Sequence, residues 1–104
     1  NVIPIKNKVF ILNFNKQEIS YGKKKIVFKG TKFIKKVPFE KKIKKNIKNI
    51  YKNLSGLNSF FGIDFMISNK KIFFLDINPR ITTSYKNINK NLKINTAKKI
   101  LNTL

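Results

Sequence analysis

Side chains that could bind a metal ion or a phosphate gather between Gly62 and Tyr85, a stretch that reads GIDFMISNKKIFFLDINPRITTSY. The chain has only four acidic residues, and two of them, Asp64 and Asp76, lie in this stretch. Each aspartate has apolar neighbours, and a polar Asn-Lys-Lys sequence separates the two apolar segments. This pattern predicts a β-hairpin with strands over residues 63–67 and 72–77.

The turn of this hairpin decides which residues oppose each other. A three-residue turn over residues 69–71 pairs Ser68 with Ile72 and places Asp64 directly opposite Asp76. Directly opposed residues on one face of a sheet have Cβ atoms about 4.5–5.5 Å apart. We therefore expect the two carboxylates to lie side by side.

The same register adds a third oxygen ligand. Side chains alternate along a strand, so Asn78 lies on the face of Asp76, with Gly62 opposite it and leaving room. The other face is predicted to supply core residues, namely Ile63, Phe65, Phe73, Leu75 and Ile77.

Two carboxylates held this close repel each other unless a positive charge compensates them. A hard cation such as Mg²⁺, or Mn²⁺, supplies that charge, and Mg²⁺ is usually held by one or two carboxylates together with substrate phosphates. The alternative is a hairpin whose exposed aspartates pair with the abundant lysines. The two aspartates alone fit a metal site and a lysine-paired hairpin equally well. The Asn-Pro-Arg sequence that follows favours a metal site formed by Asp64, Asp76 and Asn78.

Arg80 is the single arginine among 24 basic residues. It follows Pro79, which cannot donate a backbone hydrogen bond and so ends the strand. A guanidinium group can bind phosphate or carboxylate through two parallel hydrogen bonds, which an ammonium group cannot. We favour a role in ligand binding over that of an ordinary surface arginine. The hydroxyl residues Thr82, Thr83 and Ser84 follow it in what is equally well a solvated loop.

Composition excludes several kinds of chemistry. The chain has neither cysteine nor histidine, so thiolate nucleophiles, imidazole bases and the usual zinc ligands are absent. Its net charge of +20 fits a nucleic-acid-binding domain. However, the lysines are spread along the chain, and the dominant residue types all have A/T-rich codons. We favour drift in base composition and solubility as the origin of the charge, and keep the small basic nucleic-acid-binding domain as the alternative.

The remaining elements define an α+β fold class, with an antiparallel sheet and packed helices. We expect a strand over residues 8–14 and a strand, turn and strand over residues 19–36. Residues 38–56 form a helix, residues 82–91 a polar stretch, and residues from about 92 to 104 a terminal helix capped at Asn95 or Thr96. Lys23, Lys24 and Lys25 in the first turn could contact phosphate, but we favour a solvated strand edge.

The helix over residues 38–56 is amphipathic. Pro38 suits its first turn, Glu40 opposes the helix dipole there, and Gly56 is placed to end it. Its apolar residues recur at spacings of three and four, which favours packing on a core over binding to an acidic membrane. The stripe consists of Phe39, Ile43, Ile47, Ile50 or Tyr51, and Leu54.

Around the hairpin the sequence resembles the C-terminal part of an ATP-grasp domain. Its pattern is an acidic residue on one strand, here Asp64, followed after a turn by an apolar run that ends in Asp-x-Asn-Pro-Arg, here residues 73–80. Asn15-Lys16-Gln17-Glu18 and Thr82-Thr83-Ser84-Tyr85 are similar to segments of the subgroup that includes the pyrrolysine-biosynthesis ligase and archaeal tyramine–glutamate ligases. The resemblance covers roughly residues 9–85.

The resemblance implies a carboxylate–amine ligase that uses ATP and Mg²⁺. ATP phosphorylates a substrate carboxylate, and an amine attacks the acyl phosphate to form an amide-type bond. Asp76 and Asn78 would hold Mg²⁺ against the ATP phosphates, and Asp64 would share or position that metal. Arg80 would act as the catalytic residue that stabilises the transferred phosphoryl group. Many family members have Glu in place of Asp76, and the shorter side chain puts the metal geometry in doubt.

The resemblance also implies missing parts. The ATP-clamping lysines, the adenine pocket and the substrate-binding domain of the family lie upstream of the matched segment, and the chain starts at Asn1 and enters a strand almost at once. We therefore expect residues 1–104 to be one partial domain without ligase activity of its own, soluble and cytoplasmic because it shows no spanning run and no signal peptide. A degenerate, inactive ATP-grasp remnant is a further alternative.

Overall fold

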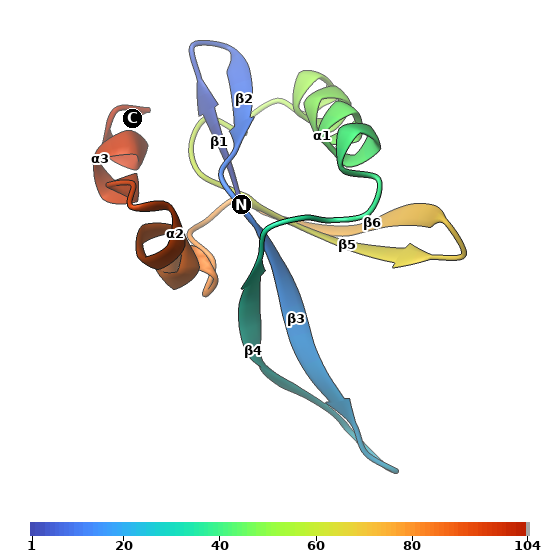
Figure 1. Ribbon diagram of the computed structural model, residues 1–104. Helices are drawn as coiled ribbons and strands as arrows, with labels where there is room; N and C mark the ends of the chain where they lie inside the picture. Colours follow the sequence, from blue (N-terminus) through green and yellow to red (C-terminus); the bar gives the residue numbers. More distant parts are fainter. Residues whose placement is uncertain (104) are drawn as a thin grey trace.

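The computed structural model describes residues 1–103, which form three β-hairpins and three helices (Figure 1). The predicted α+β class, with antiparallel sheets and packed helices, is confirmed. The elements in chain order are β1 (Val2–Ile5), β2 (Lys8–Ile11), β3 (Phe14–Tyr21), β4 (Ile26–Ile34), α1 (Glu40–Asn53), β5 (Gly62–Ser68), β6 (Lys71–Asn78), α2 (Tyr85–Leu92) and α3 (Thr96–Leu101).

The predicted single strand over residues 8–14 is divided between two hairpins. β2 pairs with β1, a strand that the sequence did not reveal, and ends at Ile11. β3 begins at Phe14 and pairs with β4. The chain changes partner at Asn13, a buried residue whose side chain accepts a hydrogen bond from the Asn1 side chain and donates one to the Asn15 side chain in β3. An apolar run shows where strands occur but not where one hairpin gives way to the next.

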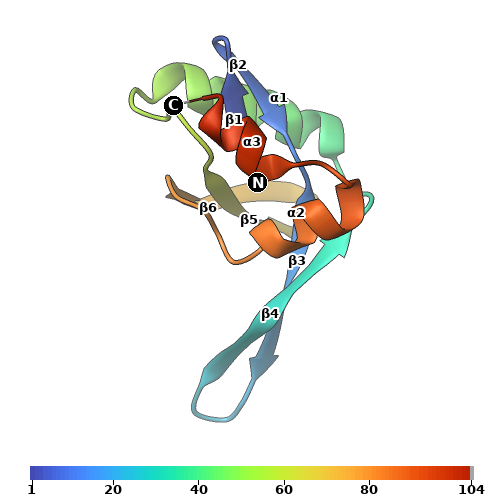
Figure 2. The ribbon, with the colours of Figure 1, turned by 90° about the vertical axis from the view of Figure 1, so that its left-hand side faces the viewer.

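The second hairpin is longer than predicted, because β3 includes the Asn15–Glu18 segment, which lay between the predicted strands. The Gly22 N–H donates to the Lys25 carbonyl oxygen at 2.8 Å, which closes the loop at the far end. A register shift between Glu18 and Ile19 leaves Lys29 as an extra residue on β4. Figures 1 and 2 show this hairpin projecting away from the rest of the molecule.

Helix α1 carries a narrower apolar stripe than the sequence predicted. Ile43 and Ile47 are fully buried, whereas Phe39 and Leu54, which lie just outside the two ends of the helix, are 44% and 45% exposed. Glu40 forms an ion pair with Lys44 one turn further on. None of the helices within residues 1–103 is long and apolar enough to cross a membrane.

The main core lies where α1 meets the hairpins. Figures 1 and 2 show α1 and α3 on opposite sides of the β1–β2 hairpin. Residues of α1, of β1 and of the segment before β5 form one buried cluster, against which β5 and β6 also pack. Its buried members are Val2, Ile43, Ile47, Leu57 and Phe61.

The polar stretch predicted over residues 82–91 is largely helical, because Tyr85–Leu92 forms α2 with Ile88 fully buried. Lys93 has a positive φ of 51°, which ends this helix. The terminal helix α3 is shorter than residues 92–104, and the Asn95 side chain caps it by accepting from the Lys98 N–H. Leu104 lies outside the described residues. The sequence of α2 is rich in asparagine and lysine, so the buried position of Ile88 was not predicted.

Candidate functional site

The β5–β6 hairpin places Asp64 opposite Asp76, as predicted, but by a different route. The turn has two residues, Asn69 and Lys70, both with positive φ, and Ser68 pairs with Lys71. That register alone would set Asp64 opposite residue 75. A β-bulge then shifts the register by one residue between Asp64 and Phe65, so Asp64 pairs with Asp76 and Gly62 with Asn78. The predicted three-residue turn was wrong, and the bulge compensates for it.

The bulge also changes which residues of β6 face the core. Phe73 and Leu75, predicted to be core residues, are 44% and 62% exposed. Ile72 and Phe74 pack on the core in their place, because the two-residue turn moves the β6 side chains between the turn and the bulge to the other face. Beyond the bulge the predicted faces return, and Ile63 and Ile77 pack as expected.

Neither aspartate forms an ion pair among the residues that the structure describes. Within residues 1–103 the only ion pair joins Glu40 and Lys44, so no lysine or arginine side chain bridges to Asp64 or Asp76. Asp76 is exposed, and its Oδ1 accepts a hydrogen bond of 2.9 Å from the Ile77 N–H. The lysine-paired alternative considered for the hairpin is therefore not what the structure contains.

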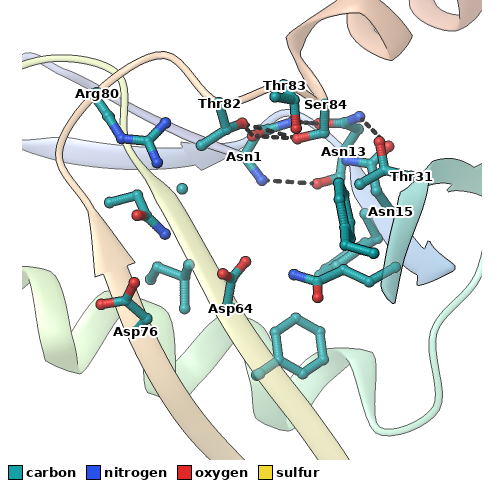
Figure 3. Close-up of a pocket in the computed structure, with 17 residues that line it drawn as sticks. Asn1, Asn13, Asn15, Thr31, Asp64, Asp76, Arg80, Thr82, Thr83 and Ser84 are labelled. Carbon is teal, nitrogen blue, oxygen red and sulfur yellow. Dashed lines mark hydrogen bonds between the residues drawn. The ribbon is translucent and has the colours of Figure 1, made fainter. Parts of the chain in front are cut away.

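Arg80 lies just past the end of β6. Its backbone N–H donates to the Asn78 carbonyl oxygen at 2.8 Å, which folds the chain around Pro79. Its guanidinium Nη1 donates to the Ile81 carbonyl oxygen at 3.2 Å and the group is otherwise free of hydrogen bonds within the described residues. Figure 3 shows this guanidinium group on the same side of the pocket as the two carboxylates.

A pocket of about 370 Å³ collects all four residues predicted to form the site, namely Asp64, Asp76, Asn78 and Arg80. Its other wall comes from β3 and β4 and consists of Phe14, Asn15, Gln17, Phe28 and Thr31. Asn15 and Gln17, from the segment that is similar to the ligase subgroup, thus line the same cavity as the aspartates. The carboxylates and Arg80 lie on one side, and uncharged amide and hydroxyl groups lie on the other (Figure 3).

The loop after Arg80 is tied to the start of the chain. The Asn1 side-chain amide donates to Asn13 Oδ1 at 2.8 Å and to Ser84 Oγ at 3.0 Å, and its oxygen accepts from Thr82 Oγ1 at 2.8 Å. Asn13 and Ser84 are both buried, and every buried side-chain nitrogen and oxygen among the described residues has a partner. This network, drawn in Figure 3, holds the loop against β1 and β2.

A second network continues along the far wall. Asn15 Oδ1 accepts from the side-chain amides of Asn13, at 3.2 Å, and Asn87, at 3.0 Å. The same Asn87 amide reaches the Thr31 hydroxyl at 3.3 Å. The network therefore joins α2 to both strands of the projecting hairpin at its base.

Gly62 permits the close approach of the loop. A Cβ atom placed on Gly62 would lie 2.5 Å from Thr82 Cγ2, so only a residue without a side chain fits there. The room predicted opposite Asn78 is therefore occupied by Thr82.

The α-amino group of Asn1 also lies at this pocket. Burial lowers its pKa from 8.0 to about 6, and the negative charge of Asp64 opposes the shift.

Several pocket residues could not be found from the sequence. Asn1, Asn13, Thr31 and Asn87 are common polar residues without a motif, and their partners lie up to 83 positions away. Gly62 at the start of β5 could have indicated the position of the Thr82 loop, since glycine within a strand often marks a close approach of another segment.

Comparison with known proteins shows the family to which this chain belongs. A family model described as an ATP-grasp domain matches residues 1–84, which include every residue that lines the pocket. The chain therefore belongs to the ATP-grasp family. The match begins before residue 9, where the resemblance began, so β1 and β2 are part of it. No curated protein and no solved structure matches significantly. Membership implies an ATP-dependent, ligase-type domain, and the family typically uses ATP and Mg²⁺.

Proposed function

We propose that this chain supplies the metal side of the ATP site in a carboxylate–amine ligase that acts through an acyl phosphate. The observation that carries the proposal is the pairing of Asp64 with Asp76, neither of which forms an ion pair within residues 1–103, in the pocket that Arg80 also lines. Directly opposed carboxylates destabilise a sheet unless something binds them. In an ATP-grasp domain, Mg²⁺ with the phosphates of ATP meets that requirement.

The donor set fits a hard divalent cation. Asp64 and Asp76 supply carboxylate oxygens and Asn78 an amide oxygen, and no sulfur or nitrogen ligand competes in a chain without cysteine or histidine. Two carboxylates completed by substrate phosphates are usual for Mg²⁺. When bound, Mg²⁺ or Mn²⁺ would neutralise charge on the ATP phosphates. We propose Asp64, Asp76 and Asn78 as its ligands, with Asn78 also facing the nucleotide.

Arg80 is proposed to bind the phosphoryl group that moves from ATP to the substrate carboxylate. Its guanidinium group has free donors and borders the same pocket, and a fixed cation at the developing negative charge is an effective form of catalysis. The bonds to Asn78 and Ile81 hold its backbone and one of its nitrogens in place.

The narrower assignments rest on the sequence resemblance. They are the subgroup of the pyrrolysine-biosynthesis and tyramine–glutamate ligases, and residues 1–104 as one partial domain. The order of Asn-x-Gln, the hairpin and Thr-Thr-Ser-Tyr supports the subgroup. Asn15 and Gln17 line the pocket, which supports a role for that segment in the site. We also propose that the 104 residues alone do not catalyse ligation, because the ATP-clamping lysines of the family have no counterpart in the matched part.

Calorimetric titration of ATP into the complete enzyme, with and without Mg²⁺, tests this function. Asp64→Asn and Asp76→Asn should each weaken Mg²⁺-dependent ATP binding by about tenfold or more, equivalent to about 1.4 kcal/mol. Glu18→Gln is the matched control, since it removes the same charge from the projecting hairpin and should change binding little. Equal ATP binding in the two aspartate variants and the wild type would refute the proposed ligands.

A further inference from the structure

The β3–β4 hairpin projects from the molecule with much of its apolar surface uncovered (Figures 1 and 2). Tyr21 is 77% exposed, Ile26 70% and Phe28 52%. A two-stranded hairpin is at best marginally stable in water without a partner surface. Exposed apolar side chains gathered on one element mark a binding surface more often than scattered ones do.

The strand register arranges these side chains in one row. Ile19 pairs with Phe28, and Tyr21 pairs with Ile26 two positions further toward the tip, so all four lie on the same face. Two aromatic rings, Tyr21 and Phe28, are therefore diagonal neighbours, about 7–8 Å apart at their backbone positions. Such spacing suits two successive flat groups that stack on the rings.

The same element is strongly positive. It carries six exposed lysines against one acid, Glu18. Three of these, Lys23, Lys24 and Lys25, form the loop at the end of the aromatic row. Lys16 and Lys32 oppose each other on the other face, and Lys29 lies at the bulge. The thickness of a two-stranded ribbon with its side chains is comparable to the Debye length of about 8–10 Å, so the lysines of the opposite face add a weaker, screened attraction to a bound polyanion.

Two other occupants fit less well. A second copy of a chain with a net charge of +20 would bring lysine against lysine along the hairpin. A lipid bilayer approached end-on would receive the three loop lysines before any apolar side chain. Single-stranded nucleic acid fits both features, because its phosphates can bind the lysines and its bases can stack on the aromatic rings.

We propose that the outer half of the β3–β4 hairpin binds single-stranded nucleic acid, with bases stacked on Tyr21 and Phe28 and the phosphate backbone along the loop lysines. This binding would be independent of sequence and sensitive to salt. Tyr21 and the loop lysines lie outside the proposed ATP pocket, whereas Phe28 borders it. Lys23, Lys24 and Lys25 lie in the loop that joins the strands of Tyr21 and Phe28, and both rings are exposed.

Fluorescence anisotropy with a labelled thymidine 12-mer and the 104-residue chain tests the proposal. Tyr21→Ala should weaken binding at least about fivefold, the lower end for losing one stacked base, whereas Tyr21→Phe keeps the ring and should bind as the wild type does. Tyr21 is mostly exposed, so these variants should stay folded, and circular dichroism checks this.

The charge contribution has its own matched pair of variants. Replacing Lys23, Lys24 and Lys25 by Gln should weaken binding and reduce the slope of log K against log salt by about 2. Replacing Lys41, Lys42 and Lys45, three exposed lysines of α1, by Gln removes the same charge and should have a much smaller effect.

Three outcomes would overturn the proposal. One is equal weakening by the two lysine triples, which would show diffuse attraction to the whole chain. Another is unchanged affinity in Tyr21→Ala. The third is binding to a duplex 12-mer, to polyglutamate or to vesicles with anionic lipid as tight as to the single strand, since none of these offers unpaired bases.

Discussion

At the scale of single residues, the pocket contains chemical groups that are rare in this chain. Asp64 and Asp76 provide the only carboxylates of the β5–β6 hairpin, and Arg80 provides the only guanidinium group of the chain. The other 23 of the 24 basic residues are all lysines. The planar guanidinium group can bind a phosphate through two parallel hydrogen bonds, which a lysine cannot, and this supports the role proposed for Arg80.

Gly62→Ala should destabilise the fold and displace the loop that follows Arg80. Its Cβ would lie 2.5 Å from Thr82 Cγ2, and overpacking of this kind typically costs about 1–3 kcal/mol. Urea unfolding of the single variant measures the loss.

Thr82→Ser provides the control for Gly62→Ala, because it removes the colliding methyl group and keeps the hydroxyl that bonds to Asn1. The double variant should recover most of the lost stability. If it is no more stable than Gly62→Ala alone, the close approach of Gly62 and Thr82 is not the cause.

At the scale of elements, the hairpin shows how much the sequence can predict. The alternation of apolar residues around Asp64 and Asp76 located both strands, and the pairing of the aspartates was right. However, the turn was one residue too long and the bulge was missed, and these two errors cancelled. Bulges leave little trace in hydrophobic alternation, so Phe73 and Leu75 were assigned to the wrong face. The prediction of one strand over residues 8–14 was wrong for a similar reason. Which strand pairs with which depends on residues far apart in the sequence.

Lys70→Gly should stabilise the β5–β6 hairpin. Lys70 has a φ of 60° and follows Asn69 with a φ of 48°, as in the type I′ turn that favours Asn-Gly. Relieving this conformation typically gains about 0.4–1 kcal/mol, or more where strain is released. Thermal or urea unfolding measures the gain. Lys71→Gly is the control, since Lys71 lies in β6 and its replacement should destabilise the strand; a similar gain from both changes would rule out the turn as the cause.

At the scale of the whole molecule, the two ends of the matched region meet at the pocket. Asn1 bonds to Ser84, 83 positions away, and Asn15 bonds to Asn87, 72 positions away. Neither contact has a local sequence signal. They explain why the loop after β6 is ordered beside β1 and β2 although the sequence there reads as a solvated stretch.

The stability of the 104-residue chain with a free α-amino group on Asn1 should rise between pH 6 and pH 8. Burial lowers the pKa of this group from 8.0 to about 6, so the unfolded chain binds more protons across that range and low pH favours unfolding. Without histidine or cysteine, the chain has no side chain that ordinarily titrates there. Urea midpoints at pH 6, 7 and 8 measure the effect.

Acetylation of the Asn1 amino group is the control for this pH dependence. The acetylated chain should show a flat profile between pH 6 and pH 8. A midpoint that falls with rising pH in the free-amine chain would contradict the predicted sign.

The most direct test of the metal site is a titration of Mn²⁺ into the isotope-labelled chain, observed by paramagnetic broadening of backbone amide signals. The amides of residues 62–64 and 76–78 should broaden first, excess Mg²⁺ should restore them, and Asp76→Asn should abolish the effect. Broadening that begins around Glu18 or Glu40, or that persists unchanged in Asp76→Asn, would contradict the proposal that Asp64, Asp76 and Asn78 form one metal site.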